Sequence, residues 1–435
     1  MVQFLIILVM TPQELLLNRK IIGLDIGTSF VRTVIGEVLD DDKIEIIGCA
    51  KKASSGLRNG VIVNRESAMN CIKECIEEAE IKAAWEGYSC VTAIGGSQTD
   101  SMNSQGLVAI SSHGKGPREI NRNDIERVLD AANAVNIPMD REMLHVIPQN
   151  YIVDGSTVLK DPEHNIAVRL EAEVHIVTAS KTAITNMTQC VERAGYNLDR
   201  VMLKTLAGMY AVMGPDEREL GSILIDLGGG TTDVIVINKG APICTISIPV
   251  GGNLVTNDIA MIKGVSSQTA EKIKVEYGCC WGGALETDSE VIIPGAGGRD
   301  PEVCLRSEIC MGIIEPRMRE IFSMVRNEII NKANTTLSGN IILTGGGALM
   351  PGAVQLAEDV FGTRAVRLGT PGDLGGLQEE YRRPDFSTVV GLVLGYHAET
   401  RNRTNDKVKK LNSSGGEGSG KSIIGKVAAF LKTCF

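Results

Sequence analysis

Ser222-Ile223-Leu224-Ile225-Asp226-Leu227-Gly228-Gly229-Gly230-Thr231-Thr232-Asp233 is the stretch that decides the fold. An apolar run ends on a carboxylate, three glycines and two threonines follow, and Val234 to Ile237 form a second apolar run. This pattern predicts two buried strands joined by a tight turn. The glycines let backbone N–H groups approach an anion, the threonines add hydroxyl donors, and Asp226 can hold a hydrated Mg2+ against phosphate oxygens. An ordinary glycine-rich hairpin turn would explain the stretch if it stood alone.

The same order of residue types occurs near the start of the chain, in Lys20-Ile21-Ile22-Gly23-Leu24-Asp25-Ile26-Gly27-Thr28-Ser29. A third glycine turn follows an apolar run in Ile341-Ile342-Leu343-Thr344-Gly345-Gly346-Gly347. The third turn has no carboxylate, so it suits contact with a base or a ribose better than contact with a metal. Three glycine turns at strand ends predict an α/β protein whose two duplicated halves hold one phosphate chain between them.

With these turns the chain resembles the actin, Hsp70 and sugar-kinase superfamily and, within it, the FtsA family of bacterial cell-division proteins. The resemblance runs from about Lys20 to His397 and returns in residues 421–435. Its most specific stretches are Leu144-His145-Val146-Ile147-Pro148-Gln149, Asp216-Glu217-Arg218-Glu219-Leu220-Gly221 and Ile314-Glu315-Pro316-Arg317. The resemblance implies an actin-like two-domain ATPase fold with subdomains 1A, 1C, 2A and 2B, and a C-terminal amphipathic helix.

The resemblance also implies that ATP and Mg2+ bind between the two halves. Asp25 and Asp226 are the expected metal ligands. Glu271 and Lys274 lie three residues apart on an expected helix and would contact the ribose and adenine, although an ordinary surface ion pair has the same spacing. The expected nucleotide-binding residues are Asp25, Gly27, Thr28, Ser29, Asp226, Gly228, Gly229, Gly230, Thr231, Thr232, Glu271, Lys274, Gly345, Gly346 and Gly347.

The segment that connects the halves, Arg200 to Met213, has few polar side chains. Hydrolases of the superfamily often place a base there to orient water, and this chain offers only Lys204 and Thr205. We therefore expect the protein to bind ATP and to hydrolyse it slowly at most. We predict no catalytic residue.

The predicted domain boundaries follow the resemblance. They are an N-terminal extension (1–17), 1A (18–100 and 181–215), 1C (101–180), 2A (216–265 and 336–385), 2B (266–335), a closing helix on 1A (386–400), a disordered linker (401–420) and a membrane-targeting amphipathic helix (421–435). In 1C, the loop Asp161 to Glu171 lacks the glycines that FtsA-like sequences tend to carry there. Segment 101–180 would contact other division proteins.

The amino-acid composition indicates a globular protein with an uneven distribution of charge. A chain of 435 residues with 43% hydrophobic and 22% charged residues is typical of a globular protein of two or more domains. The net charge of −9 argues against a general nucleic-acid binder. Residues 401–435 carry eight Lys/Arg and two Asp/Glu, so a basic tail of +6 follows an acidic body of about −15. This asymmetry predicts that the tail meets an anionic surface.

Cysteine and histidine spacing does not predict a metal site. The eleven cysteines include no CxxC pair, which favours a reducing compartment over a disulfide framework. His145, His164 and His175 are scattered among apolar strands, and we expect them to be structural. Residues 2–10 are apolar but too short to span a bilayer, and they lack the features of a signal peptide. Translation from Met10 would exclude them, and we assign them no role.

A long amphipathic helix is predicted from Glu308 to Ile330. In the FtsA family the corresponding face of 2B binds the C-terminal tail of the tubulin-like protein FtsZ. On that resemblance Arg317 and Glu320 are the candidate partner-binding residues, and Arg is a common hot-spot type. A solvated charged face is the alternative explanation.

The end of the chain combines a predicted tether with an amphipathic helix. Residues 401–420 are polar, basic and then Gly/Ser-rich, which predicts a flexible linker. In residues 421–435 the lysines flank one apolar side of the helix, a pattern typical of an interfacial membrane helix. A helix docked on its own body or on a partner would show the same pattern. The predicted membrane residues are Ile423, Ile424, Val427, Phe430, Leu431 and Phe435.

Together these features predict an actin-fold, ATP-binding adaptor of bacterial division. It would form filaments, so that many weak tail helices bind the membrane together, and would hold FtsZ at the inner face of the cytoplasmic membrane at the division septum. Two other classes remain: a pilus-type actin-like assembly protein, and a sugar-kinase or Hsp70-like ATPase.

Overall fold

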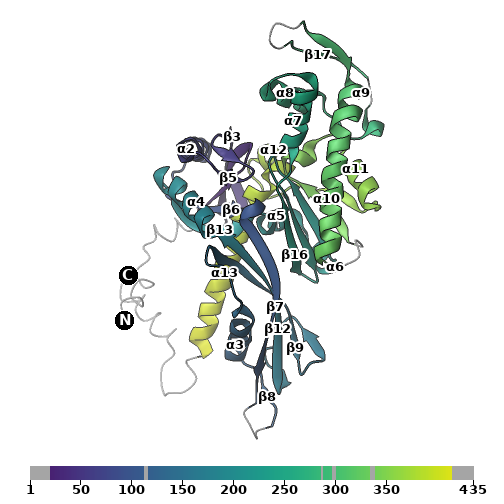
Figure 1. The fold of residues 1–435 in the computed structure, drawn as a ribbon. Coiled ribbons are helices and arrows are strands. Elements are labelled where there is room, and N and C mark those ends of the chain that lie inside the picture. The colour runs from purple at the N-terminus through teal and green to yellow at the C-terminus, as the bar shows by residue number, and fades with distance from the viewer. Residues whose placement is uncertain (1–19, 112–115, 286–287, 296–299, 334–338, 414–435) are drawn as a thin grey trace.

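The computed structural model describes residues 20–111, 116–285, 288–295, 300–333 and 339–413, with only the backbone of 402–413. Two five-stranded sheets form its centre (Figure 1). The first has the order β13-β6-β1-β2-β3, built from β1 (Lys20–Ile26), β2 (Phe30–Val38), β3 (Ile44–Ala53), β6 (Ser89–Ile94) and β13 (Asn197–Leu203).

The second sheet repeats the topology of the first. Its order is β16-β15-β14-β19-β20, built from β14 (Ser222–Leu227), β15 (Thr232–Asn238), β16 (Ala241–Ile248), β19 (Asn340–Thr344) and β20 (Val366–Leu368). In each sheet three antiparallel strands are followed by two parallel ones. The predicted α/β fold with duplicated halves is confirmed. The repeat places the β1–β2 and β14–β15 turns at equivalent positions in the two halves.

Helices cover both faces of each sheet. Helices α2 (Arg65–Ala83) and α4 (Lys181–Arg193) pack on the outer face of the first sheet. Helices α7 (Gly252–Lys263), α10 (Glu315–Ala333) and α11 (Ala353–Phe361) pack on the outer face of the second. Helices α5 (Lys204–Val212) and α13 (Ser387–Ser413) contribute to one core that joins residues of both sheets. With both faces covered, β14 is buried along its whole length, as its continuous apolar run predicted.

Two glycines of α13 set how closely it approaches α5. A Cβ on Gly391 would lie less than 3 Å from the carbonyl oxygen of Ala207, and one on Gly395 would lie 2.9 Å from the Tyr210 ring. These two positions therefore let α13 pack tightly against α5.

A separate domain is inserted into the first half between β6 and α4. Its four-stranded sheet has the order β10-β9-β12-β7, made of β7 (Thr99–Ala109), β9 (Arg141–Val153), β10 (Thr157–Leu159) and β12 (Arg169–Ser180), and α3 (Arg122–Asn133) packs on it. It lies at the end of the molecule opposite the β17 region (Figure 1). Side chains also bind it to the edge strand β16 of the second half: Asn103 donates to Ile243 O at 3.0 Å and Gln149 to Pro242 O at 2.7 Å.

The segment predicted as 2B contains a strand hairpin and an interrupted helix. Residues 278–305 contain a hairpin of β17 (Glu290–Ile293) and β18 (Glu302–Leu305). The predicted helix Glu308 to Ile330 is interrupted, because α9 (Arg306–Ile309) passes through the π-helical turn η4 (Cys310–Ile314) before α10 begins. Helix α8 (Ser267–Tyr277) completes this region.

Short elements fill the remaining connections. They are β4 (Leu57–Arg58), β5 (Val61–Ile62), η2 (Gly96–Gln98), β8 (Arg118–Glu119), β11 (Ile166–Ala167), α6 (Pro215–Leu220), η3 (Gly282–Ala284), η5 (Gly346–Leu349), α12 (Gln378–Tyr381) and η6 (Pro384–Phe386). The glycine-free loop Asp161 to Glu171 includes β11, which pairs with β8, and His164 takes the left-handed turn with φ +69°.

Helix α13 differs from the prediction at its C-terminal end. It continues to Ser413, so residues 401–413, predicted as disordered linker, are helical. The reason is that no glycine or proline occurs between Tyr396 and Ser413, and Lys and Arg are good helix formers. The predicted membrane residues, 423 to 435, lie outside the described residues. Among the described helices, none is both long and apolar enough to cross a bilayer.

Candidate nucleotide-binding site

The hairpin turns of the two sheets meet at the boundary between the halves. A Cβ on Gly229 would lie less than 3 Å from Ser29 Oγ, and one on Gly230 would lie 2.9 Å from Thr28 Oγ1. Ser29 Oγ also donates to Asn253 Oδ1, 3.4 Å away. The first two predicted turns are therefore brought together, and a Cβ on Gly230 would also lie 2.8 Å from the Asn59 backbone.

The start of α7 holds the backbone of the second turn. Gly252 N donates to Gly228 O at 3.0 Å, and Asn253 N donates to Gly229 O at 2.8 Å. Gly251 also lies against these two carbonyl groups: a Cβ on Gly251 would be 2.5 Å from Gly228 O and 2.8 Å from Gly229 O. Since α7 takes up these carbonyl oxygens, the turn can meet an anion with its N–H groups.

The threonines of the turns form bonds within the protein. Thr231 Oγ1 donates to Asp233 Oδ2 at 2.9 Å, and Thr232 Oγ1 donates to Val250 O at 2.8 Å. Thr28 Oγ1 accepts from Gly60 N at 2.8 Å. Sequence reasoning predicted these hydroxyls as phosphate donors, and in this structure they hold the turns in shape.

Asp226 has one carboxylate oxygen that is ready for a ligand. The residue is 3% exposed. Its Oδ2 accepts from Thr388 Oγ1 at 3.2 Å and lies 3.2 Å from Lys204 Nζ, whereas its Oδ1 is buried without a hydrogen-bond partner. A buried oxygen without a donor is unfavourable, and a carboxylate oxygen is the ligand type that Mg2+ prefers. Asp226 therefore fits the metal role that the sequence predicts.

Asp25 reaches the same cluster from the first half. It is 7% exposed, and its Oδ2 lies 3.8 Å from Arg32 Nη1. Burial raises the pKa of the Asp25 carboxyl, and the positive charges of Lys204 and Arg32 oppose that rise. The two predicted metal ligands thus interact with one shared cation, Lys204.

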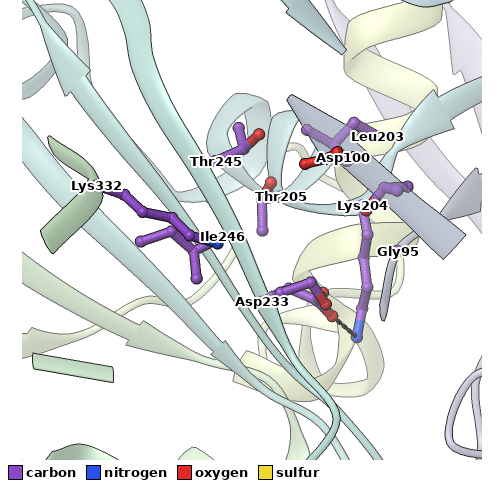
Figure 2. A pocket seen from close by; sticks show the side chains of 11 residues that line it. Gly95, Asp100, Leu203, Lys204, Thr205, Asp233, Thr245, Ile246 and Lys332 are labelled. Carbon is purple, nitrogen blue, oxygen red and sulfur yellow. Dashed lines mark hydrogen bonds and ion pairs between the residues drawn. The ribbon is translucent and has the colours of Figure 1, made fainter. Parts of the chain in front are cut away.

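Lys204 is the first residue of α5 and projects into this cluster of carboxylates. Its Nζ is 4.0 Å from Asp233 Oδ2 (Figure 2). This contact adds to the one with Asp226. Burial opposes the charge on Lys204, but Asp226, Asp233 and Asp25 outweigh burial and raise the pKa of the ammonium. The side chain lines a small pocket of about 60 Å³, partly open to solvent, where α5, β16 and the inserted domain meet.

The third glycine turn lies against the second half of the site. Gly345 has a φ of +84°, and a Cβ there would lie 2.6 Å from Leu227 O and still closer to Asp226 Oδ1. A Cβ on Gly347 would lie 2.9 Å from the Leu227 side chain, and Gly346 begins η5. The three predicted turns therefore gather around Asp226.

Glu271 and Lys274 form an ion pair that is tied to α7. Their charged groups lie 2.6 Å apart on α8, and both contact Thr256 Oγ1. Lys274 Nζ also donates to Gly252 O at 3.2 Å, next to the second turn. The pair therefore connects α8 to the start of α7, next to the second turn. Glu271 is the more exposed member, with 45% of its side chain accessible.

The candidate partner-binding residues pair with each other. Arg317 on α10 contacts Glu320 and also holds Asp258 of α7 through two hydrogen bonds of 2.5 and 3.2 Å. About 29% of the Arg317 side chain and 46% of the Glu320 side chain are accessible. The pair is part of a network that crosses from α10 to α7.

Sequence reasoning missed an ion-pair cluster beneath the first turn. Asp385 is 5% exposed and accepts from Arg32 at 3.1 Å and from Lys51 at 2.7 Å. Burial works against its charge, yet Arg32 and Lys51 hold the pKa of the Asp385 carboxyl below its usual value. The sequence held only a weak signal for this cluster. Arg32 and Lys51 are charged residues within the apolar strands β2 and β3, and their partner Asp385 lies more than 330 positions away.

Each of the three histidines has a structural partner. His145 Nε2 accepts from the backbone N of Leu203, directly before Lys204, at 2.9 Å. His175 contacts Asn103 and Thr245, and His164 contacts Glu119 at the surface. Burial lowers the pKa of His145 to about 3 and that of His175 to about 4. Within the described residues, no group of three or more His, Cys, Asp or Glu side chains could hold a metal ion.

Acidification is expected to destabilise the fold through His145. The ring stays neutral in the folded protein down to a pKa of about 3 but is protonated below about pH 6.5 in the unfolded chain, so stability falls as the pH drops below 6.5. At pH 5 the loss is about 2 kcal/mol relative to pH 7.5. Urea unfolding at both pH values should show a smaller loss in His145→Gln, whose amide oxygen can still accept from Leu203. Equal losses in the two proteins would contradict this account.

Two family models match the chain. The model described as "Cell division protein FtsA" matches residues 223–391, and that described as "SHS2 domain inserted in FTSA" matches residues 96–178, the inserted domain. The FtsA of Borreliella burgdorferi is 44% identical over 401 residues, covering 91% of this chain and 96% of the relative. Those of Pseudomonas aeruginosa and Escherichia coli K12 are 41% and 36% identical, covering 87% and 91% of this chain and 89% and 97% of the relatives.

Solved structures with a similar fold are more distant in sequence. The PilM-PilN type IV pilus biogenesis complex contains a chain that matches with a TM-score of 0.62 and 18% identity, covering 86% of this chain and 97% of that one. MreB5 of Spiroplasma citri bound to ADP matches with a TM-score of 0.52 and 15% identity, covering 89% and 99%. At this level of identity the matches show a shared actin-like architecture.

Proposed function

The chain belongs to the FtsA family of cell-division proteins, and from this membership we propose that it binds ATP, forms filaments and tethers FtsZ to the cytoplasmic membrane at the septum. One observation carries the nucleotide part of the proposal. Two duplicated sheets bring two glycine turns together beside Asp226, whose Oδ1 is buried without a partner. Loops of this composition are suited to phosphate chains.

Each part of the site has a role in the proposal. The turns at Gly27–Ser29 and Gly228–Gly230 would hold the phosphates, and the Gly345–Gly347 turn with Glu271 and Lys274 would face the nucleoside. Asp226 and Asp25 would hold Mg2+, which when bound offsets the negative charge of the phosphates. At the start of α5 the chain offers only Lys204, whose ammonium cannot accept a proton, and Thr205, whose hydroxyl is a poor base, so hydrolysis would be slow.

The partner and membrane functions rest on other regions. The FtsZ tail would bind at α10, where Asp258 fixes the Arg317 guanidinium and Glu320 lies beside it. Self-association would form filaments, and segment 101–180 would contact further division proteins. Residues 421–435 would bind the anionic inner face of the membrane weakly, and a filament would add many such contacts.

The pilus-assembly alternative has less support. Its solved representative shares the fold at 18% identity, whereas the FtsA relatives reach 44% over most of the chain. A sugar kinase or an Hsp70-like ATPase would additionally need a base or a peptide-binding domain, which the sequence does not indicate.

Membrane attachment is tested by removing the proposed anchor. We expect the full chain to sediment with anionic liposomes in Mg-ATP and a chain ending at Gly420 to stay in the supernatant, because the truncation removes the apolar face together with three lysines. Neutral liposomes test the contribution of the three lysines, and less of the full chain should sediment with them than with anionic liposomes. If neither chain sediments, the anchor proposal is wrong. If both sediment, the attachment lies elsewhere in the chain.

A further inference from the structure

The inserted domain belongs to the first half by sequence but is also attached to the second half. It lies between β6 and α4, which both pack within the first half. Side chains of its strands β7 and β9 reach β16, the edge strand of the second sheet. An edge strand has backbone carbonyl groups without a neighbouring strand on one side. At β16 the inserted domain supplies hydrogen-bond donors for such groups.

A bulge in β16 makes two consecutive carbonyl groups available to the inserted domain. The register between β15 and β16 skips Ile243, which is therefore the extra residue of a β-bulge. In a regular strand, neighbouring carbonyl groups point in opposite directions. Here Pro242 O accepts from Gln149 Nε2 at 2.7 Å, and Ile243 O accepts from Asn103 Nδ2 at 3.0 Å. The bulge thus shapes this edge for contact with the inserted domain.

A buried histidine holds Asn103 in the orientation that this contact requires. His175 is 1% exposed, and its Nδ1 lies 2.7 Å from Asn103 Oδ1. Because Asn103 Nδ2 donates to Ile243 O, its Oδ1 faces His175 and can only accept. His175 Nδ1 therefore carries the hydrogen, and its Nε2 accepts from Thr245 Oγ1 at 3.3 Å. The chain of hydrogen bonds begins and ends on β16, so each bond supports the next.

A second attachment lies at the start of the inserted domain, beside the second glycine turn. Gly96 N, in η2, donates to Asp233 Oδ1 at 2.9 Å. Thr231 Oγ1, in the turn itself, donates to Asp233 Oδ2 at 2.9 Å. Thr245 of β16 and Asp233 line the same small pocket (Figure 2). The inserted domain therefore contacts the second half both at β16 and next to the turn.

We propose that the inserted domain is a releasable bridge that holds the second glycine turn against the first. Its β16 interface consists of β16 with Asn103, Gln149, His175 and Ser101, whose Oγ donates to Thr245 O at 3.2 Å. Each hydrogen bond contributes only about 1 kcal/mol net, and polar interfaces between domains of one chain commonly allow relative motion. Breaking the β16 interface therefore loosens the contact between the two turns.

The consequence for ATP rests on the proposed ATP site. In that site the two turns would hold one phosphate chain between them, so the affinity depends on how well both turns are positioned. Release of the inserted domain from β16 would lower the affinity for ATP without any change in a residue that touches the nucleotide. The inserted domain would in this way connect its own contacts to the state of the nucleotide site.

The test removes the β16 interface with the double variant Asn103→Ala/Gln149→Ala in the full chain. Its matched control is Gln105→Ala/Asn150→Ala, which removes two amide side chains from the same strands, β7 and β9. The control amides donate to carboxylates of β12, inside the inserted domain, at 2.8 and 3.2 Å. If the double variant does not fold, Gln149→Ala takes its place, with Asn150→Ala as its control.

Two measurements separate the bridge from the ATP site. Without nucleotide, amide hydrogen exchange in residues 228–231 and 241–248 should be at least about threefold faster in the interface variant than in the control. Titration calorimetry with Mg-ATP should show at least about fivefold weaker binding by the interface variant, and binding by the control within about twofold of the wild type.

Unchanged exchange in the interface variant would overturn the inference, and so would faster exchange with unchanged affinity for ATP. If the wild-type chain does not bind Mg-ATP at all, the proposed ATP site is wrong. The exchange measurement needs no nucleotide, so it still decides in that case whether the inserted domain holds the second turn in place.

Discussion

Gly391→Ala is expected to lower the free energy of unfolding by about 3 kcal/mol. The added Cβ would lie less than 3 Å from the carbonyl oxygen and carbon of Ala207, which belong to the backbone of α5 and cannot rotate away. Helices α13 and α5 would have to separate, and the core that joins the two sheets lies around them. Urea unfolding at neutral pH measures the loss.

Gly312→Ala is the control for the same substitution elsewhere in a helical segment. A Cβ at Gly312 meets nothing within 4 Å, so replacement should leave stability unchanged or raise it by up to about 1 kcal/mol, the usual preference of a helix for alanine. If Gly391→Ala unfolds at the same urea concentration as Gly312→Ala, the close approach of α13 to α5 is not as described.

Gly251→Ala is expected to weaken ATP binding at least about tenfold while the protein stays folded. Its Cβ would lie 2.5 Å from Gly228 O and 2.8 Å from Gly229 O, so the backbone of the second turn must move. The backbone angles of Gly251 are extended and suit alanine, which confines the effect to this contact. A displaced turn no longer presents its N–H groups to the phosphates in the geometry that binding requires.

The neighbouring position supplies the comparison for Gly251. In Gly252→Ala the nearest atoms to the new Cβ are 3.7 Å away, an ordinary contact, and the backbone N–H that binds Gly228 O is kept. Fluorescence titration with a labelled ATP analogue should separate the two variants. Equal affinities would mean that the second turn does not contact the nucleotide.

The local pattern of the sequence predicted the parts of the site that depend on neighbours in the chain. An apolar run that ends on Asp and glycines predicted both hairpins, and helical spacing predicted most of α10. The repeated pattern was enough to indicate duplicated halves, because each half builds its sheet from the same order of elements.

The contacts that decide the electrostatics of the site could not be predicted in this way. Lys204 begins α5, which belongs to the core that joins the two sheets, and only this packing brings its side chain to Asp226 on β14. Asp385 and Lys51 are more than 330 positions apart in the sequence. Such pairs depend on tertiary packing, which no local period encodes. The helical residues 401–413 were missed for a different reason, because polar composition was read as disorder where no helix breaker is present.

The central claim is that this chain connects FtsZ to a membrane, and sedimentation of FtsZ with anionic liposomes tests it most directly. With the full chain and Mg-ATP, FtsZ is expected in the pellet, and with the chain ending at Gly420 it is expected in the supernatant. Arg317→Ala should leave this chain in the pellet and reduce the FtsZ that accompanies it. If the full chain sediments with the liposomes and FtsZ remains entirely in the supernatant, the proposed tether is contradicted.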